Sequence, residues 1–480
     1  MANIKAGWAE CDITPEGKAD LYGQYYHRPA DGLHSRLSAT VLALESCGRQ
    51  AVMVSLDLAL LQKDFQDELR QLVHSEIQDI QKENIFINTI HTHNAPAVDF
   101  IRGLSWLREL PDCISARDYR SFVLERVRGA VCAAWRNRQD AGIARAFGYA
   151  RIGHCRRAVY ENGTAEMYGN TCRDDFMGME GGSDSGIELM FFFDQKKKPL
   201  GVILNVACPA QIMEATYKIS GDFTGEIRTL LKKKFGSAFC TLGQISAAGC
   251  QSPRDLVRNY KTEPDFWHED GVAEIGRRLF STVTEVYQSA LENIHSDPAF
   301  AHVVKNITLP KREASETEYT AAVKELARLE KIMPEKKAYE EFCADVKRNE
   351  KIAMNHGPYD SKLHHFVLIQ NAKAVIARYE TQNAEPDYRF EMHVLRIGDS
   401  VFVTNPFELY LEYGQQLKAR SAAAQTFVIQ LCGDYGGYLP GRLAEQLGGY
   451  GGLIINGVVG SEGGKKLVDE AVQTITEVFC

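Results

Sequence analysis

The sequence predicts an α/β protein in which mixed β-sheets are flanked by helices. Short apolar runs alternate with stretches of helical spacing along most of the chain. Hydrophobic residues make up 45% and charged residues 25% of the 480 positions, which excludes a disordered or fibrous chain. No fixed-period repeat or low-complexity linker divides it. We therefore expect one domain over 1–480, with a helical insertion at 312–376.

The first part of the chain alternates between strand and helix patterns. Apolar runs at 40–45 and 51–57 surround the turn-like sequence CGRQ and predict a hairpin. A helix is then expected at 63–78, a strand at 84–90 and a second helix at 119–136.

The middle of the chain continues this alternation. Acidic residues open the segment 222–234 and three lysines close it, an order that suits a helix dipole. The other elements expected here are strands at 187–193, 200–206 and 238–245, a loop at 246–253, and a helix at 268–292.

The insertion at 312–376 differs in composition from the rest of the chain. It is rich in Lys, Glu and Ala, and Pro334 divides it. Its charges are typical of a solvated helix face. After it the strand pattern returns, and a glycine-rich stretch precedes the last helix. The expected elements are strands at 392–397, 401–404 and 427–431, and helices at 408–420 and 465–478.

Charge and cysteine usage narrow the function classes. Lys and Arg number 55 and Asp and Glu 63, so the net charge of −8 gives no electrostatic case for nucleic acid or an anionic membrane. No apolar run is long enough for a membrane span or a signal peptide. The twelve cysteines are scattered singly, so we expect free thiols in a cytoplasmic protein. A small-molecule substrate and a homo-oligomer suit this class.

The clearest chemical motif is His91-Thr92-His93 at the end of the expected strand 84–90. Side chains two residues apart on a strand share a face, so both imidazoles are expected to face one cavity. The carboxyl end of a strand is where α/β sheets usually bind ligands. Histidine serves there as a metal ligand or as an acid–base group. The alternative is a pair of structural polar residues in a loop.

Three further segments carry candidate groups. Ser252, in the sequence GCQSPR, is a nucleophile, a hydrogen-bond donor or simply a turn residue, and it lacks the GxSxG pattern. Glu408 follows a strand, where it either serves the site or compensates a helix end. Tyr438 and Tyr450 lie among glycines that either present phenols to a cavity or form turns.

Together these segments resemble the catalytic domain of the neutral (non-lysosomal, alkaline) ceramidase family. The matching runs are GWAECDITP, VSLDL and NTIHTHNAP, beside a family start like DITP, an SxD strand and an HTHSGP motif. Later segments match in the same order, and 312–376 is least covered. The resemblance implies a divergent cytoplasmic member of that fold.

The resemblance also implies roles for single residues. It implies zinc bound by His91, Glu408 and Tyr438. It places His93, Ser252, Arg156 and Tyr450 around the scissile amide.

One position departs from the family pattern. The segment NVACPAQ carries Pro209 where the family supplies a second zinc histidine, although Asp222 matches the ISxD that follows. The neighbouring Cys208 either replaces the missing ligand or is a core thiol beside a metal-free site. Cys155 and Cys250 stand where the family has asparagine and an acidic residue.

We therefore expect a hydrolase of a linear amide (N-acyl) bond in a small soluble substrate, assisted by zinc. His93 would transfer protons, Arg156 or Tyr450 would stabilise the oxyanion, and Ser252 would bind the substrate or attack it. Ceramide itself is not expected, because the chain lacks an export signal and the family's immunoglobulin-like C-terminal domain. The alternatives are a carbohydrate-active hydrolase using Glu408 or Asp222, and a non-catalytic ligand-binding descendant.

Overall fold

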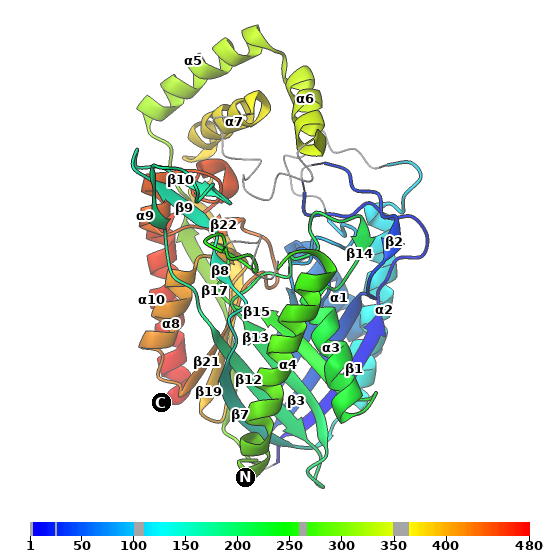
Figure 1. The fold of residues 1–480 in the computed structure, drawn as a ribbon. Coiled ribbons are helices and arrows are strands. Elements are labelled where there is room, and N and C mark those ends of the chain that lie inside the picture. Colours follow the sequence, from blue (N-terminus) through cyan, green and yellow to red (C-terminus); the bar gives the residue numbers. More distant parts are fainter. Residues whose placement is uncertain (1–2, 25, 100–109, 259–265, 349–363) are drawn as a thin grey trace.

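The computed structural model describes residues 3–24, 26–99, 110–258, 266–348 and 364–480. Three mixed β-sheets face a common interior, and each is covered on its outer side by two helices (Figure 1). The α/β class expected from the sequence is therefore confirmed.

The first sheet has the strand order β5-β4-β3-β1-β6. Its β3–β4 hairpin turns at Cys47 and Gly48, both with positive φ (50° and 74°), as a tight two-residue turn requires. Helix α1 packs Phe65, Leu69 and Val73 against the sheet. The elements are β1 (Lys5–Asp12), β3 (Ser38–Ser46), β4 (Arg49–Leu56), β5 (Ile85–Thr89), β6 (Gln139–Asp140), α1 (Lys63–Glu76) and α2 (Ala116–Arg136).

The second sheet has the order β15-β13-β12-β7. Strand β12 is buried along its whole length and β13 from Gly201 onward, which explains their continuous apolar sequences. Helices α3 and α4 cover its outer face. The elements are β7 (Gly142–Tyr149), β12 (Gly186–Phe193), β13 (Pro199–Val206), β15 (Cys240–Ile245), α3 (Asp222–Phe235) and α4 (His268–Glu292).

The third sheet has the order β17-β18-β19-β21. Its long outer strand, β17, is only partly buried and carries polar residues, so its sequence gave no strong apolar run. Helices α8 and α10 cover this sheet. The elements are β17 (Phe300–Pro310), β18 (Asp387–Ile397), β19 (Ser400–Thr404), β21 (Gln425–Ile429), α8 (Leu411–Arg420) and α10 (Ser461–Phe479).

The inner faces of the three sheets share one hydrophobic core. Phe192, Phe402 and Phe427 lie in it, and the last two rings stack with centroids 4.2 Å apart. Each large apolar side chain buried there stabilises the fold by about 1.5–3 kcal/mol. The shared core fixes the positions of the three sheets relative to one another.

Each sheet contains one parallel strand pair: β4–β5, β13–β15 and β19–β21. Hydrogen bonds tie their carboxyl ends together, from Thr89 N to Leu431 O (3.3 Å) and from Ala210 N to Ile90 O (3.3 Å). The two chain termini lie at the opposite end of the molecule (Figure 1). The segments that follow these strands therefore converge on one place.

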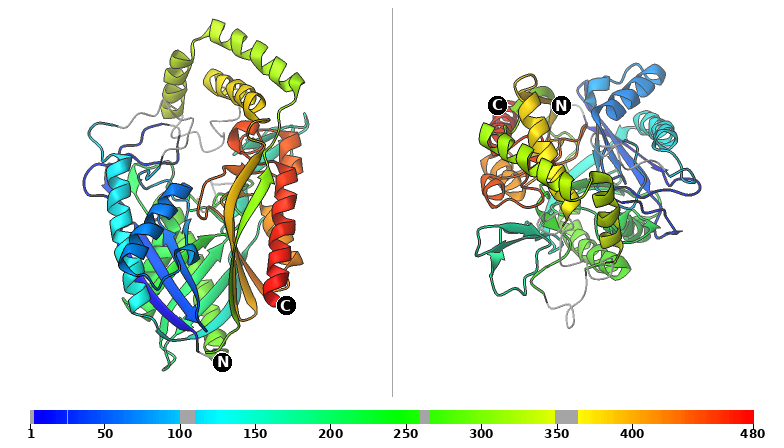
Figure 2. Two further views of the ribbon diagram at one scale, coloured as in Figure 1. Left: turned by 180° about the vertical axis from the view of Figure 1, so that it is seen from behind. Right: turned by 90° about the horizontal axis from the view of Figure 1, so that it is seen from above.

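Helices α5 (Glu316–Ile332), α6 (Glu335–Arg348) and α7 (His365–Thr381) stand at that same end (Figures 1 and 2). They form a small core of their own, and α5 begins with a capping box made by Ser315 and Glu318. Residues 349–363 of the expected insertion lie outside the described part. The division of 1–480 into one domain with an insertion stays a prediction.

Two local expectations are wrong. The helix expected at 408–420 begins at Leu411, because Glu408–Leu409 forms a short strand, β20, beside β22 (Tyr438–Leu439). Glu408 therefore does not compensate a helix end. The loop expected at 246–253 contains strand β16 (Gln251–Ser252), which pairs with β8 (His154–Cys155).

The remaining elements are short and lie outside the three large sheets and their covering helices. They are β2 (Gly32–Leu33), β9 (Arg157–Tyr160), β10 (Ala165–Met167), β11 (Phe176–Met179), β14 (Lys218–Ile219), α9 (Arg442–Leu447), and the 3₁₀ turns Lys82–Asn84 and Ile454–Asn456. No helix among the described residues is long and apolar enough to cross a membrane. The twelve cysteines are all free, as expected.

Candidate functional site

His91 follows strand β5 and adopts a left-handed backbone conformation (φ 60°), which aims its ring at the third sheet. Its Nδ1 donates a hydrogen bond to the carbonyl of Ala59 (2.7 Å). Its Nε2 lies 3.3 Å from Oε2 of Glu408. The other oxygen of Glu408 accepts a hydrogen bond from the Tyr435 hydroxyl (3.0 Å).

These contacts assign the protons of His91. A carbonyl oxygen only accepts, so Nδ1 of His91 carries the hydrogen that faces Ala59. Nε2 then faces a buried carboxylate, so either a proton on Nε2 or a metal cation between the two atoms is needed to avoid repulsion. Burial alone would lower the pKa of His91, but the Glu408 charge outweighs it and raises that pKa. Burial would likewise raise the pKa of Glu408, but His91 lowers it to about 2.

Tyr438 belongs to the same group. Strands β20 and β22 run parallel and pair Glu408 with Tyr438, so the two side chains are neighbours and hydrogen-bond. The Tyr438 hydroxyl accepts a hydrogen bond from Arg156 (3.2 Å). The ring of Tyr450 stands edge-on to that of Tyr438, with centroids 5.4 Å apart. All of these except Tyr450 are buried.

The spacing of His91 and Glu408 suits two ligands of one metal ion, and Tyr438 is the neighbouring side chain that could supply a third. Two tetrahedral zinc ligands at about 2.0–2.2 Å stand about 3.3–3.6 Å apart, and Nε2 of His91 and Oε2 of Glu408 are 3.3 Å apart. The fixed Nδ1–H of His91 is the outer contact that ligating histidines usually make. Three protein ligands are the usual number at a catalytic zinc.

The fourth family ligand has no replacement. Pro209 offers no donor, and the Cys208 thiol is directed at the carbonyls of Ile152 (3.2 Å) and Pro209 (3.6 Å) inside the core. Burial holds the pKa of Cys208 well above its usual range. Among the described residues no three side chains from His, Cys, Asp and Glu are placed to hold a metal ion together. A three-ligand site here would therefore need the phenol of Tyr438.

His93 lies beside His91, with ring centroids 4.9 Å apart. Its Nδ1 is 3.2 Å from Oε2 of Glu214, and its Nε2 is 2.8 Å from the side-chain nitrogen of Gln211. Burial lowers the pKa of His93 to about 4, and Glu214 offsets this only in part. A side chain at Gly23 would collide with the His93 ring, so only glycine fits there.

Arg156 joins the two histidine groups. Its guanidinium donates to Gln211 Oε1 (3.1 Å) and to Tyr168 (3.3 Å) on the His93 side. It also donates to Tyr438 and to the carbonyl of Gly249 (3.0 Å). A fully buried cation thus bridges the two halves of the site. The His91 half contains His91, Glu408 and Tyr438, and the His93 half contains His93, Gln211 and Glu214.

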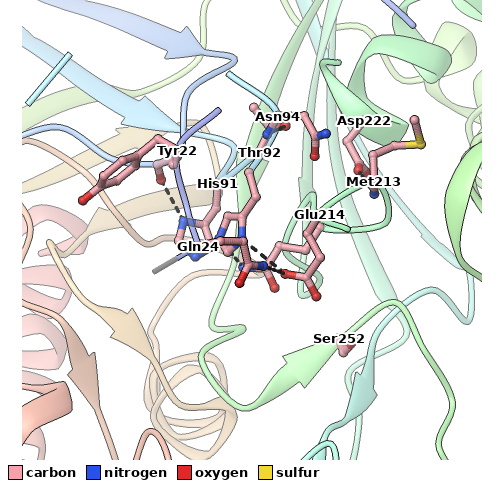
Figure 3. A network of polar contacts seen from close by, with 12 residues as sticks. Tyr22, Gln24, His91, Thr92, Asn94, Met213, Glu214, Asp222 and Ser252 are labelled. Carbon is pink, nitrogen blue, oxygen red and sulfur yellow. Dashed lines mark hydrogen bonds and ion pairs between the residues drawn. The ribbon is translucent and has the colours of Figure 1, made fainter. Parts of the chain in front are cut away.

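Ser252 is separated from the histidines. Its hydroxyl oxygen accepts hydrogen bonds from the Tyr168 hydroxyl (3.2 Å) and the backbone N–H of Arg254 (3.1 Å). Figure 3 shows Ser252 on a neighbouring strand, away from His91 and Glu214. Tyr168 also lies 3.3 Å from Glu214 Oε1, so it stands between Ser252 and the carboxylate.

Asp222 has a structural environment. Its oxygens accept hydrogen bonds from the backbone N–H groups of Met213 (2.9 Å) and Phe223 (2.8 Å) at the start of α3. Burial raises the pKa of Asp222 to about 7. Cys155 and Cys250 are buried thiols, and burial raises the pKa of Cys250 to about 12.

The structure therefore brings together most of the residues that the sequence singled out. Glu408, Tyr438 and Arg156 lie around His91 and His93, while Ser252 and Tyr450 flank them. Their individual roles stay predictions. The sequence reasoning missed four polar residues of the same network: Gln211, Glu214, Tyr168 and Tyr435. The position of Gln211 and Glu214 just after strand β13 was a usable signal, because carboxyl ends of parallel strands bind ligands.

Comparison with known proteins identifies solved structures that have a similar fold. Neither a protein-family model nor a curated protein matches the chain. Among solved structures, neutral ceramidase from Pseudomonas aeruginosa is similar with a TM-score of 0.69 at 16% identity, over 99% of this chain and 75% of that one. A ceramidase complexed with C2 is similar with a TM-score of 0.69 at 15% identity, over 99% and 76%. The chain thus has the neutral-ceramidase fold, as the sequence motifs implied.

Proposed function

We propose that this site hydrolyses a linear amide (N-acyl) bond in a small substrate. The observation that carries the proposal is a pair of adjacent buried histidine–carboxylate contacts, His91 with Glu408 and His93 with Glu214, bridged by one arginine. The likeness of the fold to ceramidases, which act on an amide, supports this class of reaction.

Amide hydrolysis needs an activated nucleophile, a stabilised oxyanion and a proton for the leaving amine. His93 is neutral and can accept the nucleophile's proton and return it to the amine. Arg156 is a permanent cation in a buried site, so its charge stabilises a developing oxyanion strongly. Tyr450 flanks Tyr438 and would contact the substrate from that side.

Zinc belongs to the proposal, held by His91, Glu408 and Tyr438. When bound, the ion would supply Lewis-acid polarisation of the scissile carbonyl and lower the pKa of the attacking water. The lone pair of His91 opposite Glu408 supports a cation at this point. A proton on His91 would satisfy the same pair, so metal content is a property to be measured.

Ser252 is proposed to position the substrate rather than attack it. A nucleophilic serine requires a base within hydrogen-bond reach. The hydroxyl of Ser252 instead contacts Tyr168, whose pKa burial raises to about 12. Such a phenol is a poor base near neutral pH.

The carbohydrate-active alternative finds less support. A glycosidase needs one carboxyl group with a raised pKa as its acid. Burial would raise the pKa of Glu214, but His93 and Arg156 lower it, and the pKa of Glu408 is also lowered. Burial raises the pKa of Asp222 to about 7, but both of its oxygens are held by backbone N–H groups at the start of α3. A cytoplasmic location and a homo-oligomer stay predictions.

A panel of N-acyl amides with different acyl lengths and amine groups tests the function. The wild-type chain should release free amine, and His93→Ala should lower kcat/KM about 10²–10⁴-fold. His295→Ala, an exposed histidine outside the site, is the matched control and should change little. Saturable binding of the amides without turnover would instead indicate a ligand-binding descendant, and turnover of glycosides alone would favour the carbohydrate alternative.

A further inference from the structure

The segment 209–214, which carries Pro209 in place of the family histidine, delivers two polar side chains to His93. Gln211 reaches Nε2 of His93 (2.8 Å) and Glu214 reaches Nδ1 (3.2 Å). One segment therefore contacts both ring nitrogens of the proposed acid–base residue.

The contact with Arg156 fixes the orientation of the Gln211 amide. A guanidinium group only donates hydrogen bonds, so the Gln211 atom that faces it at 3.1 Å is the oxygen. The amide nitrogen must then face His93. Because that nitrogen donates and never accepts, Nε2 of His93 is the acceptor and carries no hydrogen.

The contact with Glu214 indicates that the other ring nitrogen, Nδ1, carries the hydrogen. An unprotonated Nδ1 would place its lone pair 3.2 Å from a carboxylate oxygen, and the two would repel each other. A hydrogen on Nδ1 converts this repulsion into attraction. The Gln211 contact excludes a hydrogen on Nε2, and the charge of Glu214 favours one on Nδ1, so together they select the neutral Nδ1–H form of the ring.

We infer that Gln211 and Glu214 hold His93 as the Nδ1–H tautomer and that Gln211 caps Nε2, the basic atom, in the resting protein. Gln211 is thus a positioning residue that links the base to Arg156. The catalytic meaning of this arrangement rests on the proposed function, whereas the tautomer is a property of the resting protein.

The segment is held rigidly enough to impose this form. Arg28 donates to the carbonyl of Glu214 (2.7 Å), and Asp222 accepts from the N–H of Met213 (2.9 Å). Gln24 donates to Oε2 of Glu214 (3.3 Å), as Figure 3 shows for this pair. Supported side chains of this kind keep a site in its productive geometry.

The arrangement defines the path of one proton. Nε2 of His93 becomes available when Gln211 turns away from it, which follows when a substrate carbonyl draws Arg156 off the glutamine oxygen. The nucleophile's O–H bond then breaks as the Nε2–H bond forms, while its oxygen bonds to the scissile carbon and the carbonyl π pair moves onto the carbonyl oxygen. The charge of Glu214 beside Nδ1–H stabilises the resulting imidazolium. When the carbonyl re-forms, the C–N bond breaks and the proton on Nε2 moves to the leaving nitrogen.

Nitrogen-15 spectroscopy of histidine-labelled protein tests the inference without any substrate. The His93 signals are assigned by their loss in His93→Gln. We expect a pyridine-type resonance from Nε2 and a pyrrole-type resonance from Nδ1. A pyrrole-type Nε2 with a pyridine-type Nδ1, or two pyrrole-type resonances, in the wild-type chain would overturn the inference.

Variants add a second readout. Gln211→Glu places two acceptor oxygens between Arg156 and His93, so Nε2 should gain a hydrogen and become pyrrole-type. Gln473→Glu makes the same charge change on the exposed face of α10 and should leave the His93 signals unchanged. Unchanged signals in a folded Gln211→Glu protein would contradict the inference, and if that variant does not fold the wild-type spectrum decides alone.

The outcomes separate this inference from the proposed function. The expected tautomer without turnover of any amide would remove the proposed function and leave the tautomer assignment intact. Amide turnover with the opposite tautomer would overturn only the inference. If both stand, Gln211→Leu should lower kcat more than it changes KM, because it perturbs the base rather than the binding surface.

Discussion

His91 and His93 are two residues apart, yet the fold gives them opposite chemistry. Both hold their hydrogen on Nδ1. His91 then presents Nε2 to the carboxylate of Glu408, whereas His93 presents Nε2 to the neutral amide of Gln211 and keeps its carboxylate, Glu214, on the other side. The first arrangement holds a positive charge, as a proton or a metal ion, and the second keeps a neutral base.

The difference arises from which sheet supplies the partner. Glu408 comes from the end of the third sheet, beside Tyr438. Gln211 and Glu214 come from the segment after β13 in the second sheet. The comparison teaches that the HxH pattern supplies two imidazoles, while the surrounding sheets decide which one binds a cation and which one moves a proton.

The largest effect is expected from removing the bridge between the two halves. Arg156→Leu leaves the Gly249 carbonyl, Gln211 and the phenols without their buried donor, so the free energy of unfolding should fall by about 3–5 kcal/mol. Arg145→Leu breaks an exposed ion pair with Asp399 and should cost at most about 1 kcal/mol in the same denaturant titration. Equal small losses in both variants would show that the halves are not coupled through Arg156.

Asp222 gives the His93 half a pH dependence, because it holds the Met213 backbone. The pKa of folded Asp222 is about 7 and that of an unfolded aspartate about 3.9, so the folded chain binds the extra proton between these values. Its contribution is fully present below about pH 4 and is lost as pH rises through 7. The free energy of unfolding, measured by denaturant titration at each pH, should therefore fall relative to Asp222→Asn by up to about 4 kcal/mol across this window. Parallel profiles would contradict this.

Alanine substitutions at two glycines distinguish the effect of backbone strain from the effect of displacing the His93 ring. Gly23 (φ 110°) packs against the His93 ring, whereas Gly17 (φ 93°) has open space around it. Gly23→Ala should push the ring away and lower kcat/KM about 10²-fold. Gly17→Ala carries a similar backbone penalty, about 1–2 kcal/mol in stability, and should keep its activity. Similar activity losses would point to strain alone.

The smallest effect is expected at the His91 half. Tyr435→Phe removes one hydrogen bond to Glu408 and should weaken metal binding or activity by about tenfold. Competition with a calibrated zinc chelator measures the affinity. Tyr319→Phe, which removes a half-buried hydroxyl that contacts Glu380 far from the site, provides the control. A Tyr435→Phe protein with unaltered affinity would show that Glu408 does not need this support.

The sequence allowed prediction of most strands and helices, because their apolar runs and helical spacing report burial directly. It also allowed prediction of which residues gather at the strand ends. The exceptions have physical causes. Glu408 lies on a two-residue strand fixed by its pairing with Tyr438, which no local pattern reveals.

The partners of His93 were missed for a related reason. Gln211 and Glu214 lie in an irregular segment whose shape is set by distant groups, Arg28 and Asp222. Tyr168 is presented by a left-handed backbone turn (φ 55°). Their convergence is a tertiary result, although the replacement at Pro209 marked where to look.

Metal analysis of chelator-free protein tests the central contrast between the two histidines most directly. We predict near-stoichiometric zinc in the wild-type chain, its loss in His91→Ala, and its retention in His93→Ala. Zinc lost equally in both variants, or no zinc in the wild type together with unchanged stability in His91→Ala, would contradict the assignment of the cation to the His91–Glu408 half.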